Sequence, residues 1–505
     1  MPSKPFHAPR SYSLRCRIVS PLATAALLSL AHNAAATLPY VSPEAILTPP
    51  DAPTTEAPTT THSRNPQQQF ALDIYRQLVE INTTASVGDT YEAAKAMAAR
   101  LIDAGFPEAD VHAFESAPKR GNLVARLHGT GKRKPILLVA HIDVVEAKRS
   151  DWSTDPFKLV EKDGYFYARG SGDDKYMAAT WIATLIRYKK EGYRPDRDII
   201  VALETDEEAG DPKGVGIGWL IDKHRDLIDA QFALNEGGGV AMKDGKPLWN
   251  SLQTSEKVFQ SFWLETHNPG GHSSQPRKDN AIYELAAGLE RIAKFDFPVQ
   301  LNETTRLYFE RMSKIETGQV AADMQALLAP QPDPAAVARL STQVPYNAQL
   351  RTTCVATRLE GGHADNALPQ VARALINCRI LPTQPPEEVR DTLVRVLADD
   401  KITVTADQPA IPSPPSPLNP ELLKTVEKLT TKFWPGIPVL PVMSTGATDS
   451  LYLRNAGIPA YGHSGLASDM FDVRAHGKDE RVSVSSFFTG QQYLYELVKQ
   501  LSGGR

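Results

Sequence analysis

Two histidines and several carboxylates, residue types that bind catalytic metal ions, occur in five short motifs along the chain. These motifs are His141–Asp143, Arg169–Lys175, Glu204–Gly210, Asn235–Gly239 and His476–Glu480. Three of the five directly follow short apolar runs that are typical of buried strands. Because ligands gather beyond the carboxyl ends of the strands in an open α/β sheet, we expect these motifs to meet at one edge of a sheet. Histidine and carboxylate ligands without thiolates favour a catalytic zinc site over a structural one.

Spacing within the motifs suggests how single residues could act. His141 and Asp143 are two positions apart, so in a continued strand they share a side, and the carboxylate can accept the second ring N–H of the histidine. Glu207 and Glu208 are adjacent, so one can bind a metal while the other reaches a water molecule. Each motif alone can also be explained without a metal site. A single His-x-Asp sequence more often occurs by chance, and an acidic turn can simply be a solvated loop or a helix N-cap.

Alternating strands and helices must position these motifs. The runs Ile136–Ala140, Ile199–Leu203 and Phe232–Leu234 are short and uniformly apolar, which predicts strands buried on both faces, as in a parallel sheet covered by helices. Apolar residues at helical spacing predict three helices in the same part of the chain, namely Phe70–Ile81, Tyr91–Ala104 and Met177–Tyr188. The core of the chain is therefore expected to be α/β.

The pattern changes near Ser255, where strands alternate more clearly between apolar and polar residues, as in a sheet with one solvated face. The expected strands are Val258–Thr266, Asn347–Arg358, Val371–Leu381 and Ile402–Thr405, and the expected helices are Asn280–Ala293 and Pro386–Ala398. The proline-rich stretch Pro409–Pro420 separates this block from a final α/β portion. We therefore expect a second domain, residues 254–412, inserted between the catalytic segments 67–253 and 413–505.

The N-terminal region indicates export. Residues 1–36 hold four basic and no acidic residues, an apolar run at Ile18–Ala31 and the small-residue sequence Ala34-Ala35-Ala36, which together predict a secretory signal peptide. A membrane anchor is the alternative, but the apolar run is shorter than the ~20 residues that a spanning helix needs. Residues 37–66 contain seven prolines and seven threonines, which predicts a tether outside the core.

The composition of the chain argues against several classes of function. The chain has 505 residues, with 55 Lys and Arg against 59 Asp and Glu and a net charge of −4, which argues against a nucleic-acid or anionic-membrane binder. Its three cysteines, Cys16, Cys354 and Cys378, cannot form a disulfide framework or a thiolate zinc site. Export would permit a bond between the last two, although the sequence alone cannot place them within reach of each other.

The five motifs, in this order, resemble the co-catalytic zinc exopeptidase and amidohydrolase family that includes carboxypeptidase G, carboxypeptidase S, aminoacylase and succinyl-diaminopimelate desuccinylase. The resemblance runs from about Phe70 to the C-terminus. It implies the zinc exopeptidase fold, in which a mixed, largely parallel sheet is flanked by helices and carries an inserted α+β lid domain. It also implies two Zn²⁺ ions per subunit, with Co²⁺ or Mn²⁺ as alternatives.

The resemblance assigns roles at the metal site. The implied metal ligands are His141, Asp173, Glu208, Glu236 and His476. Asp173 would bridge both metals, and in the family the peptide bond that follows this residue is often cis. Asp143 is the implied carboxylate behind the first histidine, and Glu207 is the implied general base.

Further residues are implied for substrate binding. His272, in the lid motif Gly270–Pro276, is expected to stabilise the oxyanion, and in dimeric members this histidine comes from the neighbouring subunit. Asn366 is an expected substrate contact, Arg379 is expected to bind the substrate carboxylate, and Gly446 is the candidate in the loop Ser444–Ser450. Residues near 316–346 enlarge the lid, as in the carboxypeptidase S branch. His463 could line the pocket, but a structural role is favoured.

The resulting hypothesis is an exported di-zinc metallopeptidase, periplasmic or extracellular, that hydrolyses small peptides or N-acyl amino acids with a free C-terminal carboxylate. An aminopeptidase or a dipeptidase with the same metal site is the alternative. A catalytically silent peptide-binding protein is more remote, because all five ligands and Glu207 are present. We expect no nucleic-acid partner and no stable membrane insertion, and the resemblance allows a homodimer through the lid.

Overall fold

A ten-stranded mixed sheet forms the centre of the computed structural model, which describes residues 64–211 and 213–504. Its strands are β1 (Val111–Ala117), β2 (Arg120–Leu127), β3 (Ile136–His141), β6 (Ile199–Glu204), β7 (Phe232–Asn235), β8 (Val240–Lys243), β9 (Lys246–Glu256), β16 (Val439–Ser444), β17 (Ala460–Gly462) and β18 (Ala467–Asp469). Their order is β1-β2-β6-β3-β7-β17-β9-β8-β18, with β16 also paired to β9. The pairs around β3 are parallel, so the expected mixed, largely parallel sheet is confirmed. The expected signal peptide and nearly all of the expected tether lie outside the described residues.

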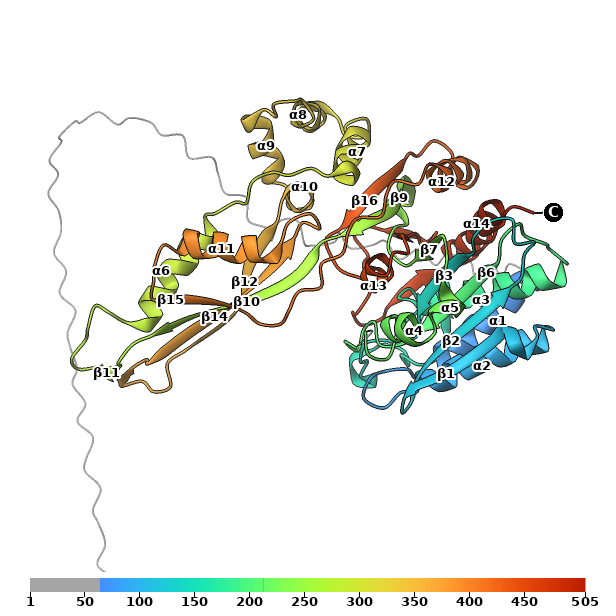
Figure 1. Ribbon diagram of the computed structural model, residues 1–505, viewed down its shortest axis with the longest axis horizontal. Helices are drawn as coiled ribbons and strands as arrows, with labels where there is room; N and C mark the ends of the chain where they lie inside the picture. The colour runs from blue at the N-terminus through green and yellow to red at the C-terminus, as the bar shows by residue number, and fades with distance from the viewer. Residues whose placement is uncertain (1–63, 212, 505) are drawn as a thin grey trace, which may run out of the picture. The chain divides into compact units, whose positions relative to one another are not determined.

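Helices cover both faces of this sheet (Figure 1). One group comprises α1 (Pro66–Glu80), α2 (Thr90–Asp103), α3 (Lys175–Lys190), α12 (Pro420–Phe433) and α14 (Val484–Ser502), and the other comprises α4 (Ile217–Lys223), α5 (Arg225–Ile228) and α13 (Ser450–Asn455). Along β3, Ile136 and Leu138 pack with the first group, whereas Leu137 and Val139 pack with the second. Burial on both faces explains why this strand has no polar alternation.

Residues 258–406 contain a second, antiparallel sheet in the order β12-β14-β10-β15. Its strands are β10 (Val258–His267), β12 (Thr353–Gly361), β14 (Val371–Ile380) and β15 (Ile402–Ala406), and its helices are α6 (Ala281–Ala293) and α11 (Pro386–Leu397). Both helices lie along one face (Figure 1), and β14 alternates between buried and more exposed residues, as expected for a sheet with one open face. We call this unit the lid. Cys354 and Cys378 are directly opposite each other in the lid and form a disulfide.

One expected strand is wrong in its first half. Residues 344–350 form the helix α10 (Val344–Leu350), and β12 starts only at Thr353. Pro345 fits the first turn of a helix, and Tyr346 and Leu350, four residues apart, are both buried in one cluster. The proline in the first turn and the apolar residues at helical spacing therefore determine the structure of this segment, despite its strand-like composition.

The enlarged segment that we expected to extend the lid packs against the central sheet. It forms α8 (Gly318–Leu327), α9 (Pro334–Ser341) and the start of α10, and α7 (Glu303–Met312) precedes it. Their apolar residues, such as Phe309 and Leu340, share a core with Leu440 of β16. The segment is therefore joined to the catalytic part of the chain through β16.

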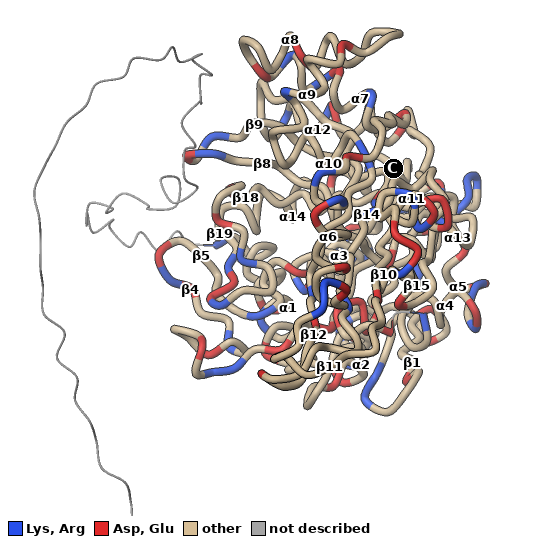
Figure 2. Tube along the Cα trace, turned by 90° about the vertical axis from the view of Figure 1, so that its left-hand side faces the viewer, with Lys and Arg blue, Asp and Glu red and all other residues tan. Residues whose placement is uncertain are grey.

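Short strands complete the described part of the chain. The elements β4 (Val160–Lys162), β5 (Tyr165–Tyr167) and β19 (Arg481–Ser483) form a three-stranded sheet, and β11 (Gly271–His272) pairs with β13 (Ala367–Leu368). Acidic and basic residues are interspersed along the trace (Figure 2). Within the two described ranges, no helix has both the length and the apolar character required to span a bilayer.

Candidate active site

The ends of three neighbouring strands place most of the candidate metal ligands. His141 is the last residue of β3, Glu207 and Glu208 follow the end of β6, and Glu236 follows the last residue of β7. Since these strands are adjacent in the order β6-β3-β7, their carboxyl ends lie side by side. Asp173, two residues before α3, joins them from a loop, as the position of ligands beyond strand ends predicts.

Asp173 lies at the centre of this site. Its Oδ1 is 3.0 Å from Nε2 of His141, and its Oδ2 is 3.2 Å from Nε2 of His476. The Nε2 of His476 also lies 2.6 Å from a carboxylate oxygen of Glu208. The two oxygens of one carboxylate therefore face two different histidines, which is the arrangement that a bridging ligand requires. The Asp173–Asp174 peptide bond is cis, as the resemblance led us to expect.

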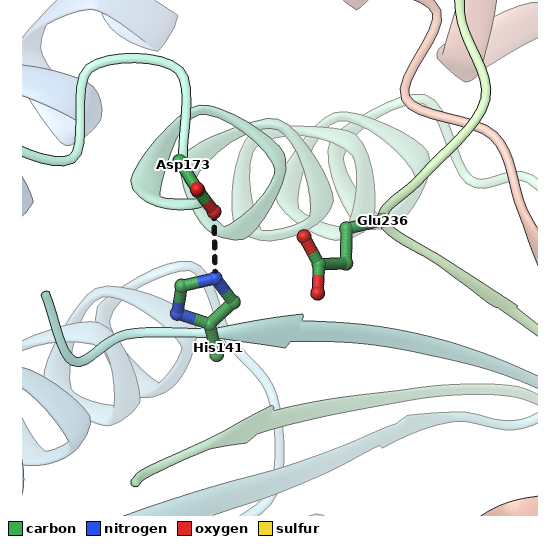
Figure 3. Close-up of side chains that lie close together, drawn as sticks. All are labelled: His141, Asp173 and Glu236. Atoms are coloured by element: carbon green, nitrogen blue, oxygen red, sulfur yellow. Dashed lines mark hydrogen bonds and ion pairs between the residues drawn. The ribbon is translucent and has the colours of Figure 1, made fainter. Parts of the chain in front are cut away.

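Two groups of potential ligands share this aspartate. The first contains His141, Asp173 and Glu236, which point into one space (Figure 3), and the second contains Asp173, Glu208 and His476. In each group the ligand atoms lie within 4.8 Å of one another. All five predicted metal ligands are thus brought together. Glu207 lies beside them, in a third group with His141 and Glu208.

The charges at this site fit bound cations. Burial raises the pKa of Glu236 well above its usual value, and neighbouring acids including Glu207 and Asp173 raise it further. Burial also raises the pKa of Glu207 to about 8, with Asp449 and Glu208 contributing. Carboxylates held this close repel one another unless positive charge lies between them. Two histidines and three carboxylates form a suitable donor set for two divalent metals.

Asp143 supports the site differently from the expectation. The Nδ1 of His141 lies 3.1 Å from the main-chain carbonyl of Asp143 and 3.5 Å from its carboxylate. The ring N–H therefore donates to the main chain, which still leaves Nε2 free to face Asp173. The carboxylate, only 1% exposed, instead accepts main-chain N–H bonds from Glu207, Glu208 and Ala209 at 3.3, 3.0 and 3.2 Å. It holds the turn that carries the proposed base and one ligand.

Arg169 and Glu480 also support the metal ligands, and the sequence analysis assigned them no role. The Glu480 carboxylate accepts the Nη1–H of Arg169 at 2.8 Å and main-chain N–H bonds from Gly170 and Gly172 at 3.0 and 2.8 Å. Arg169 in turn donates to the carbonyls of His476 and Gly477. This buried ion pair joins the loop of Asp173 to the loop of His476. The sequence did hold one sign of this pair, because Arg169 and Glu480 have opposite charges and stand at the outer ends of two ligand motifs.

The predicted substrate residues of the lid lie in two places. His272 and Asn366 meet at the β11–β13 pair, where Ser273 N–H donates to the Asn366 carbonyl. Both are exposed, and the ring of His272 contacts Ser274. Arg379 lies on β14 with its guanidinium 4.8 Å from the ring of Phe259. Among the described residues, no hydrogen bond or ion pair joins these three residues to the metal ligands.

Gly446 and His463 belong to the catalytic part of the chain. The Gly446 N–H donates to Oγ of Ser444, which shapes the loop 444–450. His463 is fully buried, donates from Nδ1 to the Ser251 carbonyl at 2.9 Å and accepts from the Tyr493 hydroxyl at 2.7 Å. Burial lowers the pKa of His463 to about 4. These contacts occupy both ring nitrogens, so the favoured structural role of His463 is confirmed.

Residues 137–500 match the family model described as Peptidase family M20/M25/M40. The chain belongs to this family. It is 28% identical over 387 residues to the human N-fatty-acyl-amino acid synthase/hydrolase, covering 72% of this chain and 74% of the relative. It is also 28% identical over 377 residues to a probable carboxypeptidase S-like protein of Dictyostelium discoideum, covering 72% and 71%.

The fold is similar to that of an M20 family metallo-carboxypeptidase from Sulfolobus solfataricus. The TM-score is 0.62 at 19% identity, and the match covers 85% of this chain and 98% of the other. Membership of the family makes this chain a hydrolase of the metallopeptidase and amidohydrolase type. The resemblance noted in the sequence is therefore confirmed, and so is the zinc exopeptidase fold.

Proposed function

We propose that this protein is an exported di-zinc enzyme that hydrolyses the amide bond of small peptides or N-acyl amino acids bearing a free C-terminal carboxylate. The single observation that carries the proposal is the position of Asp173, whose two oxygens face His141 and His476. Glu236 completes the first group of ligands and Glu208 the second. Zinc is the proposed metal because histidine and carboxylate oxygen are its common catalytic ligands.

The chemistry assigned to this chain centres on Glu207. When bound, the metal pair supplies Lewis acidity, which polarises an amide carbonyl and lowers the pKa of water. Glu207 takes the proton of the attacking water and then returns it to the departing amine. The position of Glu207 supports this role, because its carboxylate shares a group of potential ligand atoms with His141 and Glu208. His272 is proposed to stabilise the oxyanion that forms on the carbonyl.

Two cationic side chains without acidic partners among the described residues support the proposal that the substrate carries a free carboxylate. Burial lowers the pKa of Arg379, and no acidic residue is within ion-pair distance of its guanidinium among the described residues. Lys257 is buried nearby, and its pKa falls to about 7 because of burial and the charge of Arg379. A carboxylate bound by Arg379 would relieve this repulsion. The guanidinium can hold it through two parallel hydrogen bonds.

The relatives point to the same substrate class. The name of the human relative specifies N-fatty-acyl amino acids, and that of the Dictyostelium relative specifies a carboxypeptidase S-like protein. Both names describe substrates with a carboxylate on the departing side of the amide. This agreement favours a carboxypeptidase or aminoacylase over an aminopeptidase.

Export and assembly are further parts of the proposal. The disulfide between Cys354 and Cys378 supports export, because such bonds persist in oxidising compartments. The edge strand β12 supports a homodimer through the lid, since its Val355 and Leu359 are 60% and 70% exposed. Mass spectrometry of the N-terminus of the secreted protein tests cleavage near Ala36, and light scattering of the purified protein tests the dimer.

A hydrolysis panel on the zinc-loaded protein tests the enzymatic proposal. The panel crosses free or acetylated N-termini with free or amidated C-termini in otherwise identical dipeptides and tripeptides, with products identified by mass spectrometry. We expect cleavage that tolerates the blocked N-terminus and requires the free C-terminus. Metal analysis by plasma mass spectrometry is expected to give two zinc ions per chain.

The other outcomes of the panel each contradict the proposal in a different way. A requirement for a free N-terminus alone would make the protein an aminopeptidase and would leave Arg379 without its proposed role. A requirement for both free ends would make it a dipeptidase. No hydrolysis of any substrate would favour a peptide-binding protein.

A further inference from the structure

A small cavity lies where the chain passes between the central sheet and the lid. We call this place the crossover, and it consists of residues 256–258 on the outward path and 409–413 on the return. The cavity has a volume of about 160 Å³. Its walls are mainly apolar and include Val258, Phe259, Pro409, Ile411, Ala447 and Leu451.

We propose that this cavity binds the side chain of the substrate residue that bears the free carboxylate. The inference rests on the proposed function and deepens it, because it assigns the side chains that the enzyme selects. Phe259 connects the two parts of this site: its ring packs under the guanidinium of Arg379 and also lines the cavity. A carboxylate bound at Arg379 therefore places the adjoining side chain next to the cavity.

The loop expected to contact substrate forms another wall. Ala447 lines the cavity and follows Gly446 directly. The neighbouring Thr448 donates its main-chain N–H and its hydroxyl to Glu256 at 3.2 and 2.9 Å. Lys257 N–H donates to the carbonyl of Ser444 at 2.9 Å. The loop is thus fixed to the crossover, so the cavity has a defined shape.

The charged residues of the cavity already have partners. Glu256 pairs with Arg454, and the two side chains are 3% and 2% exposed. Arg454 also donates to Oγ of Ser413 at 3.0 Å. The Nζ of Lys257 donates to the Arg351 carbonyl at 2.7 Å and to the hydroxyl of Thr353. Because the walls are mainly apolar and Glu256 is already paired with Arg454, the cavity favours an apolar side chain.

The volume sets the size of that side chain. Sites for whole drug-sized ligands are usually ~300–1,000 Å³, which is larger than this cavity of about 160 Å³. An apolar cavity of about 150 Å³ holds a benzene molecule. The cavity therefore fits one isobutyl or benzyl group. Leucine and phenylalanine are expected to fit, tryptophan is too large, and glycine leaves the cavity unfilled.

Hydrolysis of a series of N-acetyl amino acids tests this subsite. The series contains glycine, alanine, leucine, phenylalanine, tryptophan and glutamate, and kcat/KM is measured for each with the zinc-loaded full chain. We expect leucine and phenylalanine to exceed glycine and glutamate by about 10-fold or more, as hydrophobic pockets commonly discriminate. Tryptophan is expected to fall below phenylalanine by a similar factor.

Two substitutions at one position change the cavity in opposite directions. Ile411 is 40% exposed and belongs to none of the proposed catalytic groups. Ile411→Ala should enlarge the cavity and raise the tryptophan-to-alanine ratio of kcat/KM about 10-fold, whereas Ile411→Phe should lower the phenylalanine-to-alanine ratio about 10-fold. Val394→Ala, at an exposed position of α11, is the matched control and should leave both ratios unchanged.

The outcomes separate this inference from the proposed function. Hydrolysis of the whole series without discrimination by size, or unchanged ratios in both Ile411 variants, would overturn the subsite and leave the proposed function standing. A preference for glutamate would also overturn it. No hydrolysis of any member would overturn the proposed function and the subsite together.

Discussion

The two regions of the proposed active site differ in how completely the fold assembles them. At the carboxyl ends of the central strands, Asp173 lies within 3.2 Å of both histidines, and buried Asp143 and Glu480 hold the surrounding loops. In the lid, His272 is exposed and the guanidinium of Arg379 packs on the ring of Phe259. The fold alone assembles the metal-binding region, whereas we propose that a substrate or a second subunit completes the contacts of the lid residues.

The largest expected effect is the loss of turnover in Glu207→Gln. Removing a general acid and base commonly costs 10²–10⁴-fold, so kcat should fall by about this factor. The zinc content should remain unchanged, because the predicted ligands stay in place. Single-turnover kinetics and metal analysis of the same sample check both expectations. Glu290→Gln, on an exposed helix position, is the control, and an unchanged rate in Glu207→Gln would exclude this residue as the base.

Arg379→Ala tests the other region. The loss of charge-assisted hydrogen bonds worth about 3 kcal/mol should raise KM for substrates with a free carboxylate about 100-fold. Hydrolysis of amidated substrates and the zinc content should stay as they are. Arg373→Ala is the matched control, since Arg373 lies on the same strand and pairs with Glu360. An equal effect on amidated substrates would give Arg379 a different role.

Asp143→Asn probes how the metal-binding region is held. Partners that orient metal ligands commonly contribute 10–100-fold in affinity, and an amide cannot accept the three main-chain N–H bonds of the 207–209 turn as well as a carboxylate does. We expect zinc affinity to fall about 10-fold, measured by competition with a chelator. His141→Ala, which removes a proposed ligand, should lower the zinc content further. An unchanged zinc affinity in Asp143→Asn would show that the 207–209 turn keeps its conformation without the Asp143 carboxylate.

The smallest expected effect concerns buried His463 and the pH dependence of the free energy of unfolding. The pKa of His463 is about 4 in the folded protein and ~6.5 when unfolded, so below pH 6.5 only the unfolded state takes up the proton. The contribution of neutral His463 to the free energy of unfolding is therefore complete above pH 6.5 and is lost as the pH falls towards 4. Between pH 7.5 and 5.5 the loss is about 1.4 kcal/mol.

Urea unfolding of the metal-free protein at these two pH values measures this change. His463→Gln should be less stable at pH 7.5 but should lack this part of the pH dependence. His363→Gln, at an exposed position, should keep the wild-type dependence. An identical pH dependence in His463→Gln and in the wild type would contradict the assignment.

The central strands could be predicted because burial on both faces leaves a clear sequence pattern, whereas the metal ligands were assigned from the resemblance of the five motifs to a known family. Ile136–Ala140 and Ile199–Leu203 needed no knowledge of their partners to be recognised as strands. The helix α10 was mistaken for a strand because its apolar residues serve a cluster with Leu440, about ninety residues away. The role of Glu480 was missed for a similar reason, since its partner Arg169 is 311 residues away in sequence.

The ion pair between Arg169 and Glu480 has a consequence for biosynthesis. A ribosome delivers the chain from its N-terminus, and domains fold as their residues emerge. His141, Asp173 and Glu236 are available early, but His476 and Glu480 belong to the last motif to be made. A nascent chain therefore contains all the residues of the first group while the second group still lacks His476. We therefore expect hydrolytic activity only from chains that include this motif.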